Sequence, residues 1–417
     1  VAVLEEGIGG WKFWGELRFD ARWADESDGA YANSDSQSGY AHNGETEFDL
    51  NRYRLWISKQ IDDKTTVTMR LGGSSISWQR YFATIQLPWD SYLMVGQWNY
   101  DWEGEAGLYI DEDAWFTDQT LKGFYWRKNL AKGDITLFAT HDEKDGKDKD
   151  DKVVGGIGDR YNYGARFNFN MNDKFRIAIS GLYFDYDNDG NAKLTYSSSG
   201  AERRLFDGNV VSLSDAFKSE YYDYGTYWAD FGITFSPGFE FKGAYYIQDH
   251  DGPNGVSHFD DSPNAYKAII DVSQDVMKFT SLWIEYAKFD PNFHTALDPW
   301  DAFGAELTPN LTMPAVSNVW ETEAIFVRLE QQWDDKWVTY QRYGQFDHSM
   351  EGYASKLYGP GSYDITNWTF GVQYWYTPTV MFELAYDDVD YDDGWTKNVD
   401  ADLKDDNLIR FRTHIFF

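Results

Sequence analysis

The sequence predicts an all-β protein that folds as a transmembrane antiparallel up-and-down β-barrel, with about 18 strands, or about 16 if residues 66–87 form merged segments. Three observations support this fold class. Extended segments alternate apolar and polar residues with the period of two that a β-strand has. The connectors between them are alternately short and long, as expected when turns lie at one rim and loops at the other. Aromatic residues make up 19% of the chain although its mean hydropathy is −0.61.

Composition excludes several other classes. A helical membrane protein needs apolar runs of about 20 residues, and the sequence contains none. A chain without cysteine forms neither disulfides nor thiolate metal sites. The formal net charge of −32 argues against a nucleic acid partner, because phosphate binding requires a basic surface. The chain begins at Val1 without a charged-then-apolar leader, so we expect that any signal peptide has been removed, and a preceding periplasmic or cell-wall-binding domain is left open.

The alternation is clearest in residues 161–171. One face carries Tyr161, Tyr163, Ala165, Phe167, Phe169 and Met171, and the other carries Asn162, Gly164, Arg166, Asn168 and Asn170. Residues 227–235, 239–248 and 368–376 repeat this pattern. Many apolar faces begin or end in Tyr, Trp or Phe, which is typical of the aromatic girdles at membrane interfaces. A soluble β-sandwich also alternates, but it favours aliphatic residues inside and does not sort its connectors by length.

The connectors define the expected topology. The short ones are rich in Pro, Gly, Asn and Asp, which tolerate turn geometry, and they fall at 62–64, 88–91, 131–134, 172–174, 236–238, 274–278, 334–336 and 377–379. The long ones fall at 24–46, 100–120, 143–159, 188–220, 251–263, 290–318, 350–363 and 389–406, while 72–77 is short. An even strand count places both ends at the short-turn rim. We therefore expect residues 1–417 to form a single barrel domain.

The last segment, residues 407–417, closes the predicted barrel. Ile409, Phe411, Thr413, Ile415 and Phe417 share one face, and Arg410, Arg412, His414 and Phe416 share the other. A terminal aromatic residue after an alternating segment is typical of the last strand of barrels from the bacterial outer membrane. Closure would place this strand beside the first one.

The strand rhythm, the unequal connectors and the terminal Phe417 resemble bacterial outer-membrane porins of the general diffusion type along the whole chain. The resemblance implies an integral outer-membrane protein with long extracellular loops and short periplasmic turns, surrounded by lipid and assembled as a homotrimer. It implies passive passage of ions and small hydrophilic solutes through a water-filled channel, and no enzymatic activity. In size and acidity the chain is also similar to barrels linked to an S-layer homology domain, although the chain contains no such domain.

Basic side chains fall on the faces that would line the lumen. They are Arg52, Arg54, Arg70, Arg80, Arg166, Arg410 and Arg412. A guanidinium group keeps its charge, and placing it in contact with lipid hydrocarbon costs free energy. We therefore expect these side chains to face a water-filled lumen. Pairing with neighbouring carboxylates that stabilises the wall is the other interpretation. Replacing Arg410 and Arg412 with alanine is expected to change ion selectivity without unfolding the barrel.

Residues 101–120 follow the fifth segment and carry acidic residues with no Lys or Arg. The acidic residues are Asp101, Glu103, Glu105, Asp111, Glu112, Asp113 and Asp118. The position matches the porin loop that folds into the lumen. The resemblance therefore implies a constriction between this loop and the arginine wall, which is the part of the barrel wall that carries the lumen-facing arginines named above. The loop lacks the Pro-Glu-Phe signature of that family. An ordinary solvated surface loop is the alternative.

Charge and aromatic residues bear on selectivity. The net charge of −32 favours cations at the mouths, whereas the arginines favour anions at the throat, and together they predict a weak cation preference with a broad solute range. A sugar or oligosaccharide channel is the second interpretation, with an aromatic track containing Trp56, Trp228, Trp283 and Trp375. A soluble carbohydrate-active β-protein is the third.

No sequence motif indicates catalysis or a tightly bound cofactor. The chain has no Gly-x-Ser-x-Gly elbow, phosphate loop or His-Glu-x-x-His site. Asp185, Asp187 and Asp189 resemble the start of a calcium loop, but the twelfth position is Tyr196 where such a loop has a bidentate Glu. We expect at most weak binding of divalent ions such as Ca²⁺ there, and a solvated loop tip is the other interpretation.

Overall fold

The computed structural model describes most of the chain. The described residues are 10–24, 47–72, 77–110, 114–142, 160–186, 195–196, 203–204, 210–211, 224–250, 262–290, 293, 295, 320–350, 362–391 and 406–417.

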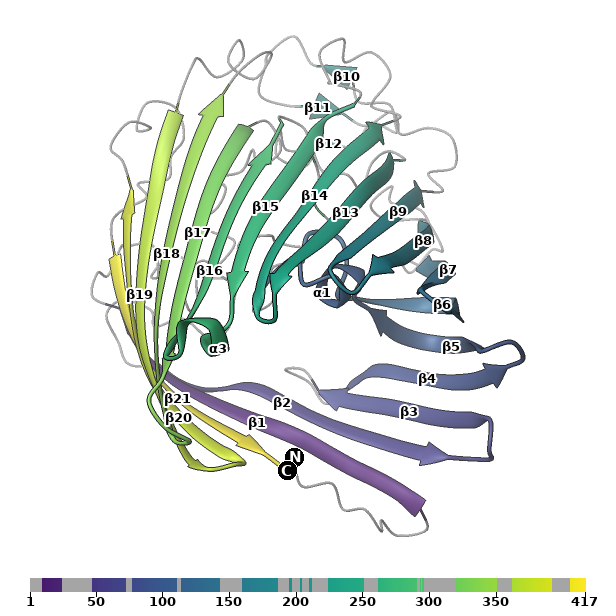
Figure 1. Cartoon of the computed structure of the whole chain (residues 1–417), viewed down its shortest axis with the longest axis horizontal. Helices are drawn as coiled ribbons and strands as arrows, with labels where there is room; N and C mark the ends of the chain where they lie inside the picture. The colour runs from purple at the N-terminus through teal and green to yellow at the C-terminus, as the bar shows by residue number, and fades with distance from the viewer. Residues whose placement is uncertain are drawn as a thin grey trace.

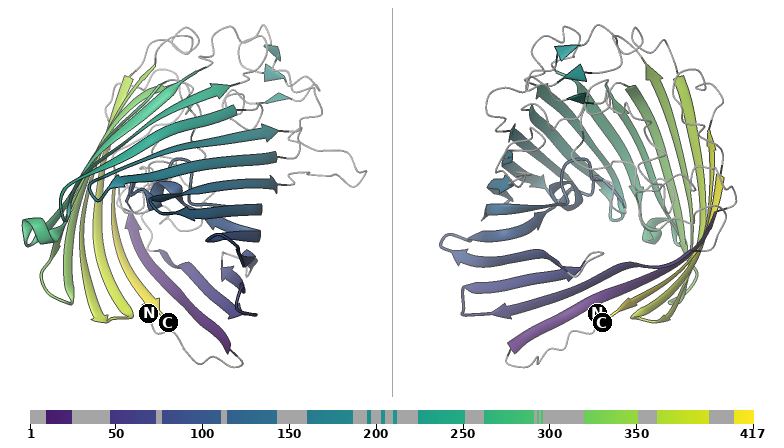
Figure 2. Two further views of the ribbon diagram at one scale, coloured as in Figure 1. Left: turned by 45° about the vertical axis from the view of Figure 1, so that its right-hand side comes forward. Right: turned by 180° about the vertical axis from the view of Figure 1, so that it is seen from behind.

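The described residues form one antiparallel sheet of 18 strands that closes on itself, because the first strand, β1, pairs with the last, β21. Figure 1 shows this ring of strands, and Figure 2 shows it from two other sides. The strands are β1 (Trp11–Ala24), β2 (Glu47–Gln60), β3 (Thr65–Gly72), β4 (Ser77–Leu87), β5 (Ser91–Tyr100), β6 (Gln119–Leu130), β7 (Gly133–Asp142), β8 (Arg160–Asn172), β9 (Phe175–Tyr186), β13 (Tyr224–Ser236), β14 (Phe239–His250), β15 (Asn264–Val272), β16 (Thr280–Phe289), β17 (Trp320–Gln332), β18 (Trp337–Met350), β19 (Ser362–Thr377), β20 (Val380–Tyr391) and β21 (Asp406–Phe416). The predicted fold class and the count of 18 are confirmed.

Tight turns join the strands at one rim, at the places where the sequence predicted them. The turn between β4 and β5 contains Trp89 and Asp90, whose φ angles are 63° and 54°, and the turn between β13 and β14 contains Gly238 at φ 79°. A short helix, α3 (Gln274–Met277), lies in the turn between β15 and β16. Positive φ angles allow these turns to reverse the chain within very few residues. Such angles are costly for most residues and acceptable for glycine.

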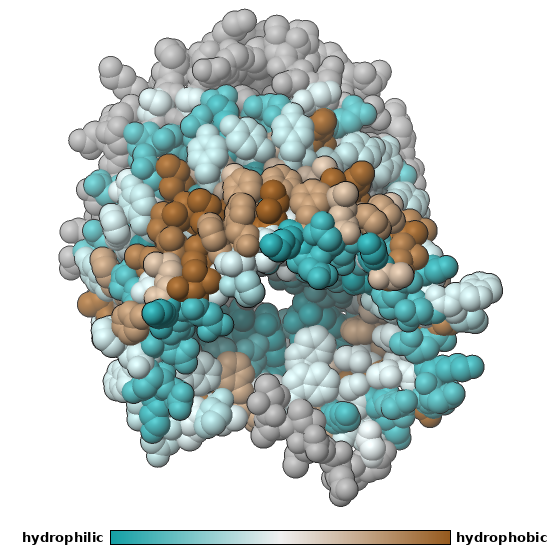
Figure 3. All heavy atoms as spheres, viewed as in Figure 1, coloured by the Kyte–Doolittle hydropathy of each residue, from teal (hydrophilic) through white to brown (hydrophobic). Residues whose placement is uncertain are grey.

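Side chains alternate between the two faces of the barrel wall. In β8, Tyr163 and Phe167 on the outer face are each 44% exposed, whereas Asn162 and Arg166 on the inner face are 2% and 3% exposed. In β13, Tyr227 is 51% exposed and Trp228 is 2% exposed. Figure 3 shows apolar residues gathered in a band across the wall, beside a hollow in this face. An apolar outer face on a closed sheet, which has no unpaired edge, is the arrangement of a membrane-spanning barrel.

Some small elements were not predicted from the sequence. The connector after β5 contains a helix, α1 (Trp102–Glu105), and the connector after β9 contains a separate sheet of β10 (Thr195–Tyr196), β11 (Arg203–Arg204) and β12 (Val210–Val211). Two-residue strands are too short to leave an alternating pattern, which is why sequence reasoning missed them. In the described part of the chain, no helix is long and apolar enough to cross a membrane.

A buried carboxylate holds the two ends of the chain together. Asp20 of β1, whose side chain is fully buried, accepts hydrogen bonds from Nε and Nη2 of Arg412 on β21, at 2.7 and 2.8 Å. Arg22 of β1 donates a third bond to Asp20 at 2.9 Å. Charge-assisted bonds of this kind are among the strongest in proteins. The seam of the barrel, where β1 pairs with β21, is therefore held by backbone hydrogen bonds and by an ion-pair network of Asp20, Arg22 and Arg412.

We predict that Asp20→Ala lowers the free energy of unfolding by about 3–5 kcal/mol, because it leaves two largely buried guanidinium groups without their carboxylate. Denaturant unfolding of the refolded barrel in lipid vesicles would measure this. Asp63→Asn, in an exposed turn, is the control and should change the free energy of unfolding by less than about 0.5 kcal/mol. Equal stability of both variants would contradict the assigned role of Asp20.

Candidate functional site in the barrel interior

The segment between β5 and β6, residues 101–118, is here called the inner loop, and its residues 111–113 lie outside the described part. It starts with α1, where Asp101 accepts a hydrogen bond from the backbone N–H of Gly104 at 2.7 Å. The backbone N–H of Leu108 then bonds to the carbonyl of Glu103 at 2.9 Å. Gly107 between them has φ +62°, a conformation that favours glycine. The first half of the inner loop is thus a compact turn.

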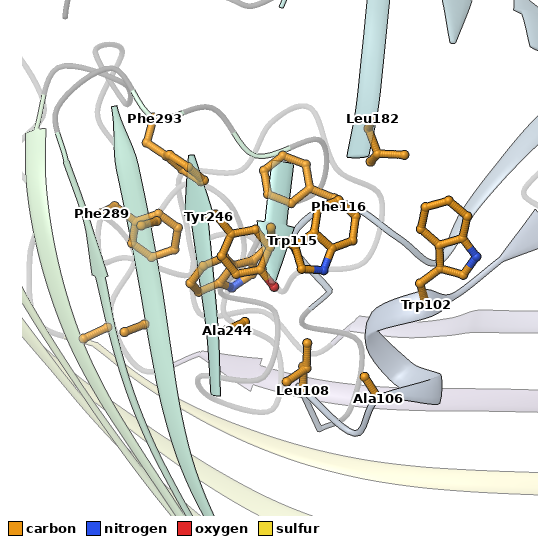
Figure 4. Packing of buried hydrophobic residues seen from close by; sticks show 14 of the residues in the cluster. Trp102, Ala106, Leu108, Trp115, Phe116, Leu182, Ala244, Tyr246, Phe289 and Phe293 are labelled. Atoms are coloured by element: carbon orange, nitrogen blue, oxygen red, sulfur yellow. The ribbon is translucent and has the colours of Figure 1, made fainter. Parts of the chain in front are cut away.

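Apolar side chains fix the inner loop to the inner face of the wall. Trp102, Trp115 and Phe116 are at most 1% exposed. The ring centroid of Trp115 lies 4.4 Å from that of Phe289 on β16 and 4.9 Å from that of Tyr246 on β14. Figure 4 shows this aromatic cluster between the loop and the strands. Burial of large aromatic side chains contributes strongly to packing energy, so the loop is held against strands far from its own ends.

A buried glutamate adds a polar anchor. Glu103 is fully buried. Its Oε1 accepts a hydrogen bond from the hydroxyl of Tyr246 at 2.8 Å, and its Oε2 accepts bonds from the backbone N–H groups of Phe116 and Thr117 at 2.8 and 2.9 Å. These bonds join both halves of the inner loop to β14. A buried carboxylate is acceptable only with such donors around it.

Cationic side chains from the wall bind the backbone of the loop. Lys267 on β15 donates a hydrogen bond to the carbonyl of Leu108 at 3.0 Å, and its Nζ lies 4.0 Å from the centroid of the Trp115 ring. Arg176 on β9 donates to the carbonyl of Ala106. The inner loop is therefore clamped from β9 to β16, on one side of the lumen.

Asp101 and Glu105 of the described part of the loop are also bonded. Tyr109 donates its hydroxyl hydrogen to Asp101 at 2.7 Å, and burial together with this carboxylate raises the pKa of the Tyr109 phenol, so the phenol stays neutral. Arg127 of β6 pairs with Glu105 at 2.7 Å and with Asp134 at 3.0 Å.

The structure changes the roles expected for the acidic residues. Glu103 does not face the lumen, because it is buried between the loop and β14 and holds the two together. Asp101 and Glu105 are partly exposed but bonded within the loop or to Arg127. Asp118 is exposed at the end of the loop. Asp111, Glu112 and Asp113 lie outside the described residues.

Several predicted arginines face inward but are paired. Arg410 bonds to Glu383 at 2.5 Å, Arg54 to Glu16 at 3.1 Å, and Arg166 lies 3.5 Å from Asp230. Arg410 and Arg166 are at most 3% exposed. For these arginines the structure supports the interpretation that pairing stabilises the wall.

The pairing also changes the outcome expected when Arg410 and Arg412 are replaced with alanine. Arg410 balances the buried Glu383, and Arg412 balances the buried Asp20. Their removal would leave two carboxylates buried without a cation, so loss of stability is now expected in addition to any change in selectivity.

Arg52, Arg54, Arg70 and Arg80 lie together on β2, β3 and β4. Arg70 is directly opposite Arg80 on β4, and Trp56 on β2 is directly opposite Arg70. The guanidinium carbons of Arg70 and Arg80 lie 5.2 and 5.5 Å from the centroid of the Trp56 ring. The sequence placed these arginines on neighbouring strands, but only the register shows that Arg70 and Arg80 share one cross-strand row with Trp56.

Sequence reasoning missed several inward residues that extend the arginine wall. Arg18 and Arg22 lie on β1, and Arg328 and Arg342 are directly opposite each other on β17 and β18. Arg18, Arg22 and Arg328 occupy the polar face of an alternating segment, so the same pattern could have found them. Arg342 shares its face with the buried Val338, Tyr340 and Phe346, and only the structure places it inward.

The predicted aromatic track is not continuous. Trp228 is 2% exposed beneath the inner loop, where its ring centroid lies 6.2 Å from that of Trp102, and Trp283 is 6% exposed. Only Trp56 and Trp375 of the four predicted tryptophans are partly exposed. This geometry does not favour a sugar channel lined by these residues.

The predicted divalent-ion site is described only in part. Asp185 is the last residue but one of β9, whereas Asp187 and Asp189 lie outside the described residues. Within the described residues, no group of three or more His, Cys, Asp or Glu side chains is arranged to hold a metal ion.

No protein-family model and no curated protein matches the chain. Solved structures resemble it along its whole length. OccK3 (OpdO) of Pseudomonas aeruginosa is 11% identical, with 100% of this chain and 98% of that chain covered and a TM-score of 0.53. The chain has the fold of bacterial outer-membrane porins.

Two further structures share this barrel. The outer membrane protein OprD of Pseudomonas aeruginosa is 11% identical, covers 98% of this chain and 94% of its own, and has a TM-score of 0.53. The outer membrane channel DcaP of Acinetobacter baumannii is 10% identical, covers 99% of both chains, and has a TM-score of 0.50. At these identities the likeness concerns the porin fold alone.

We predict that Glu103→Ala increases the single-channel conductance, because it leaves the buried donors of Tyr246, Phe116 and Thr117 without an acceptor, at about 1–3 kcal/mol each, and loosens the inner loop. Planar bilayer recordings would measure the conductance. Glu105→Ala removes the same charge but leaves this anchor intact, and is the matched control. A Glu103→Ala channel with the conductance of the control would contradict the anchoring role.

Proposed function

We propose that the protein is a porin integral to the bacterial outer membrane, which forms a water-filled channel for passive diffusion of ions and small hydrophilic solutes and catalyses no reaction. The observation that carries this proposal is a closed barrel with apolar side chains outside and charged side chains inside. Such a wall replaces lipid with a polar path. Discrete conductance steps in planar bilayers, and swelling of liposomes in small neutral sugars, would support it. A purified protein that stays in solution without detergent would contradict it.

We further propose that the constriction lies between the inner loop and the arginine wall. The inner loop is clamped to strands β9 to β16. Most residues of the arginine wall lie on other strands, namely β17, β18, β21 and β1 to β4. The two groups of strands occupy different arcs of the closed sheet, so solutes would pass between them. The channel would select solutes by diameter and by the charges at this level.

Assembly as a homotrimer is part of the proposal. The outward face is apolar, and such a face suits contact with either lipid or a second subunit. The mass of the protein–detergent complex, measured by light scattering with the detergent contribution subtracted, would distinguish a trimer from a monomer.

The balance of charges predicts how ion preference depends on salt. The net charge of −32 favours cations at the mouths. Arg54, Arg410 and Arg412 are paired with carboxylates, whereas Arg70 forms no ion pair with the described residues, so positive charge remains inside around Arg70 and Arg80. Exposed charges are screened by salt more than partly buried ones.

We therefore predict a weak cation preference at low salt that declines, and turns toward anions, as ionic strength rises. Reversal potentials under tenfold gradients, measured near 0.01 M and again near 1 M KCl, where the Debye length falls from about 30 to about 3 Å, would measure this change. A channel that prefers anions at low salt, or whose cation preference increases with salt, would contradict the assignment of charges.

A further inference from the structure

Arg70 and Arg80 differ from five other described arginines of the wall in what surrounds them. Arg54, Arg410, Arg412, Arg166 and Arg328 each pair with a carboxylate within 3.5 Å. Arg70 forms no hydrogen bond or ion pair with any residue in the described part of the chain, although it is only 7% exposed and its Nε is buried without a partner. Arg80 makes one described hydrogen bond, to the hydroxyl of Thr120 at 3.2 Å.

The charges around this pair are mostly of the same sign. The guanidinium groups of Arg80, Arg54 and Arg52 act electrostatically on Arg70, and the carboxylate of Asp118 opposes them. A guanidinium does not lose its proton. Two side-by-side cations, one of them almost fully buried, are costly unless an anion balances them. The contacts with the Trp56 ring offset only part of that cost.

The ring of Trp56 also orders the two guanidinium groups. Both guanidinium carbons lie within 5.5 Å of its centroid, and Trp14 on β1 stacks against the same ring, with the planes 3° apart and the centroids 5.9 Å apart. Trp14, Trp56, Arg70 and Arg80 therefore form one row across β1 to β4. A fixed row of two guanidinium groups presents several N–H donors to one ligand.

We propose that Arg70 and Arg80 form a binding site for a doubly charged tetrahedral oxyanion, the phosphate or sulfate group of a solute that enters the channel. The two positive charges match two negative charges, and the guanidinium forks match several acceptor oxygens at once. Trp56 is a positioning residue, because it holds the guanidinium planes but offers the anion no hydrogen bond. The site rests on the proposed channel function, since a solute reaches it through the lumen, and Arg80 beside Thr120 places it next to the end of the inner loop.

The test uses sulfate, which stays doubly charged over the usual pH range, as the probe. Single-channel current of the full-length protein in KCl is measured while potassium sulfate is added at constant ionic strength. We expect saturable reduction of the current by sulfate, and an apparent dissociation constant that rises about tenfold or more in Arg70→Gln, because a charge-assisted contact is lost. Arg328→Gln removes the same charge from another inward arginine and should leave the sulfate constant unchanged.

Two further variants separate binding from general charge. Arg70→Lys keeps the charge but loses the planar fork, so we expect an intermediate rise in the constant. Trp56→Leu should raise the constant several-fold, because the guanidinium planes of Arg70 and Arg80 lose the ring that orders them. Refolding is checked by the heat-dependent shift in gel mobility, and if Arg70→Gln fails to refold, Arg70→Lys and Trp56→Leu carry the test.

The outcomes distinguish the oxyanion site from the channel itself. A protein that forms no conductance steps in bilayers contradicts the proposed function. A wild-type channel with normal conductance but no saturable effect of sulfate overturns the oxyanion site alone. Equal sulfate constants for Arg70→Gln and wild type, or equal rises in Arg70→Gln and Arg328→Gln, would also overturn it, because the effect would then be general charge in the lumen.

Discussion

A charge inside the barrel wall must be balanced, and the interior of this protein follows from how each charge is balanced. Asp20 is shared by two arginines at the seam, Glu383 is paired with Arg410, and Glu103 takes its hydrogen bonds from the backbone of the inner loop and from Tyr246. The same rule fixes the seam, the wall and the loop, because a buried ion without partners costs several kcal/mol. The inner loop is thus held in place by the same kind of interaction that keeps the barrel folded.

The barrel itself could be predicted from the sequence because its signal is local. Apolar and polar residues alternate along each strand, and the connectors alternate between turns and loops, so each segment indicates its own structure without knowledge of its neighbours. Tyr163 and Arg166 lie on the faces expected from their parity in β8. The final strand behaves likewise: Ile409 and Phe411 are exposed outside, whereas Arg410 is buried inside.

The partners of inward side chains could not be predicted, because they depend on register and on contacts between distant parts of the chain. Glu103 and Tyr246 are 143 positions apart, and Asp20 and Arg412 are 392 apart. A shift of one residue in any strand pairing would move these groups to the opposite face. The acidic content of residues 101–120 therefore suggested a charged loop facing the arginines, whereas burial gave Glu103 a structural role.

Counting charged residues is consequently a poor guide to the field within such a channel. A paired arginine and carboxylate form a dipole whose field declines quickly with distance, so Arg412 beside Asp20 affects a passing ion much less than its formal charge suggests. An arginine without a carboxylate beside it acts over a longer range, especially where burial lowers the local dielectric constant. Under the proposed channel function, Arg70 and Arg80, for which the described residues supply no paired carboxylate, would therefore dominate the interaction with a solute at that level of the lumen.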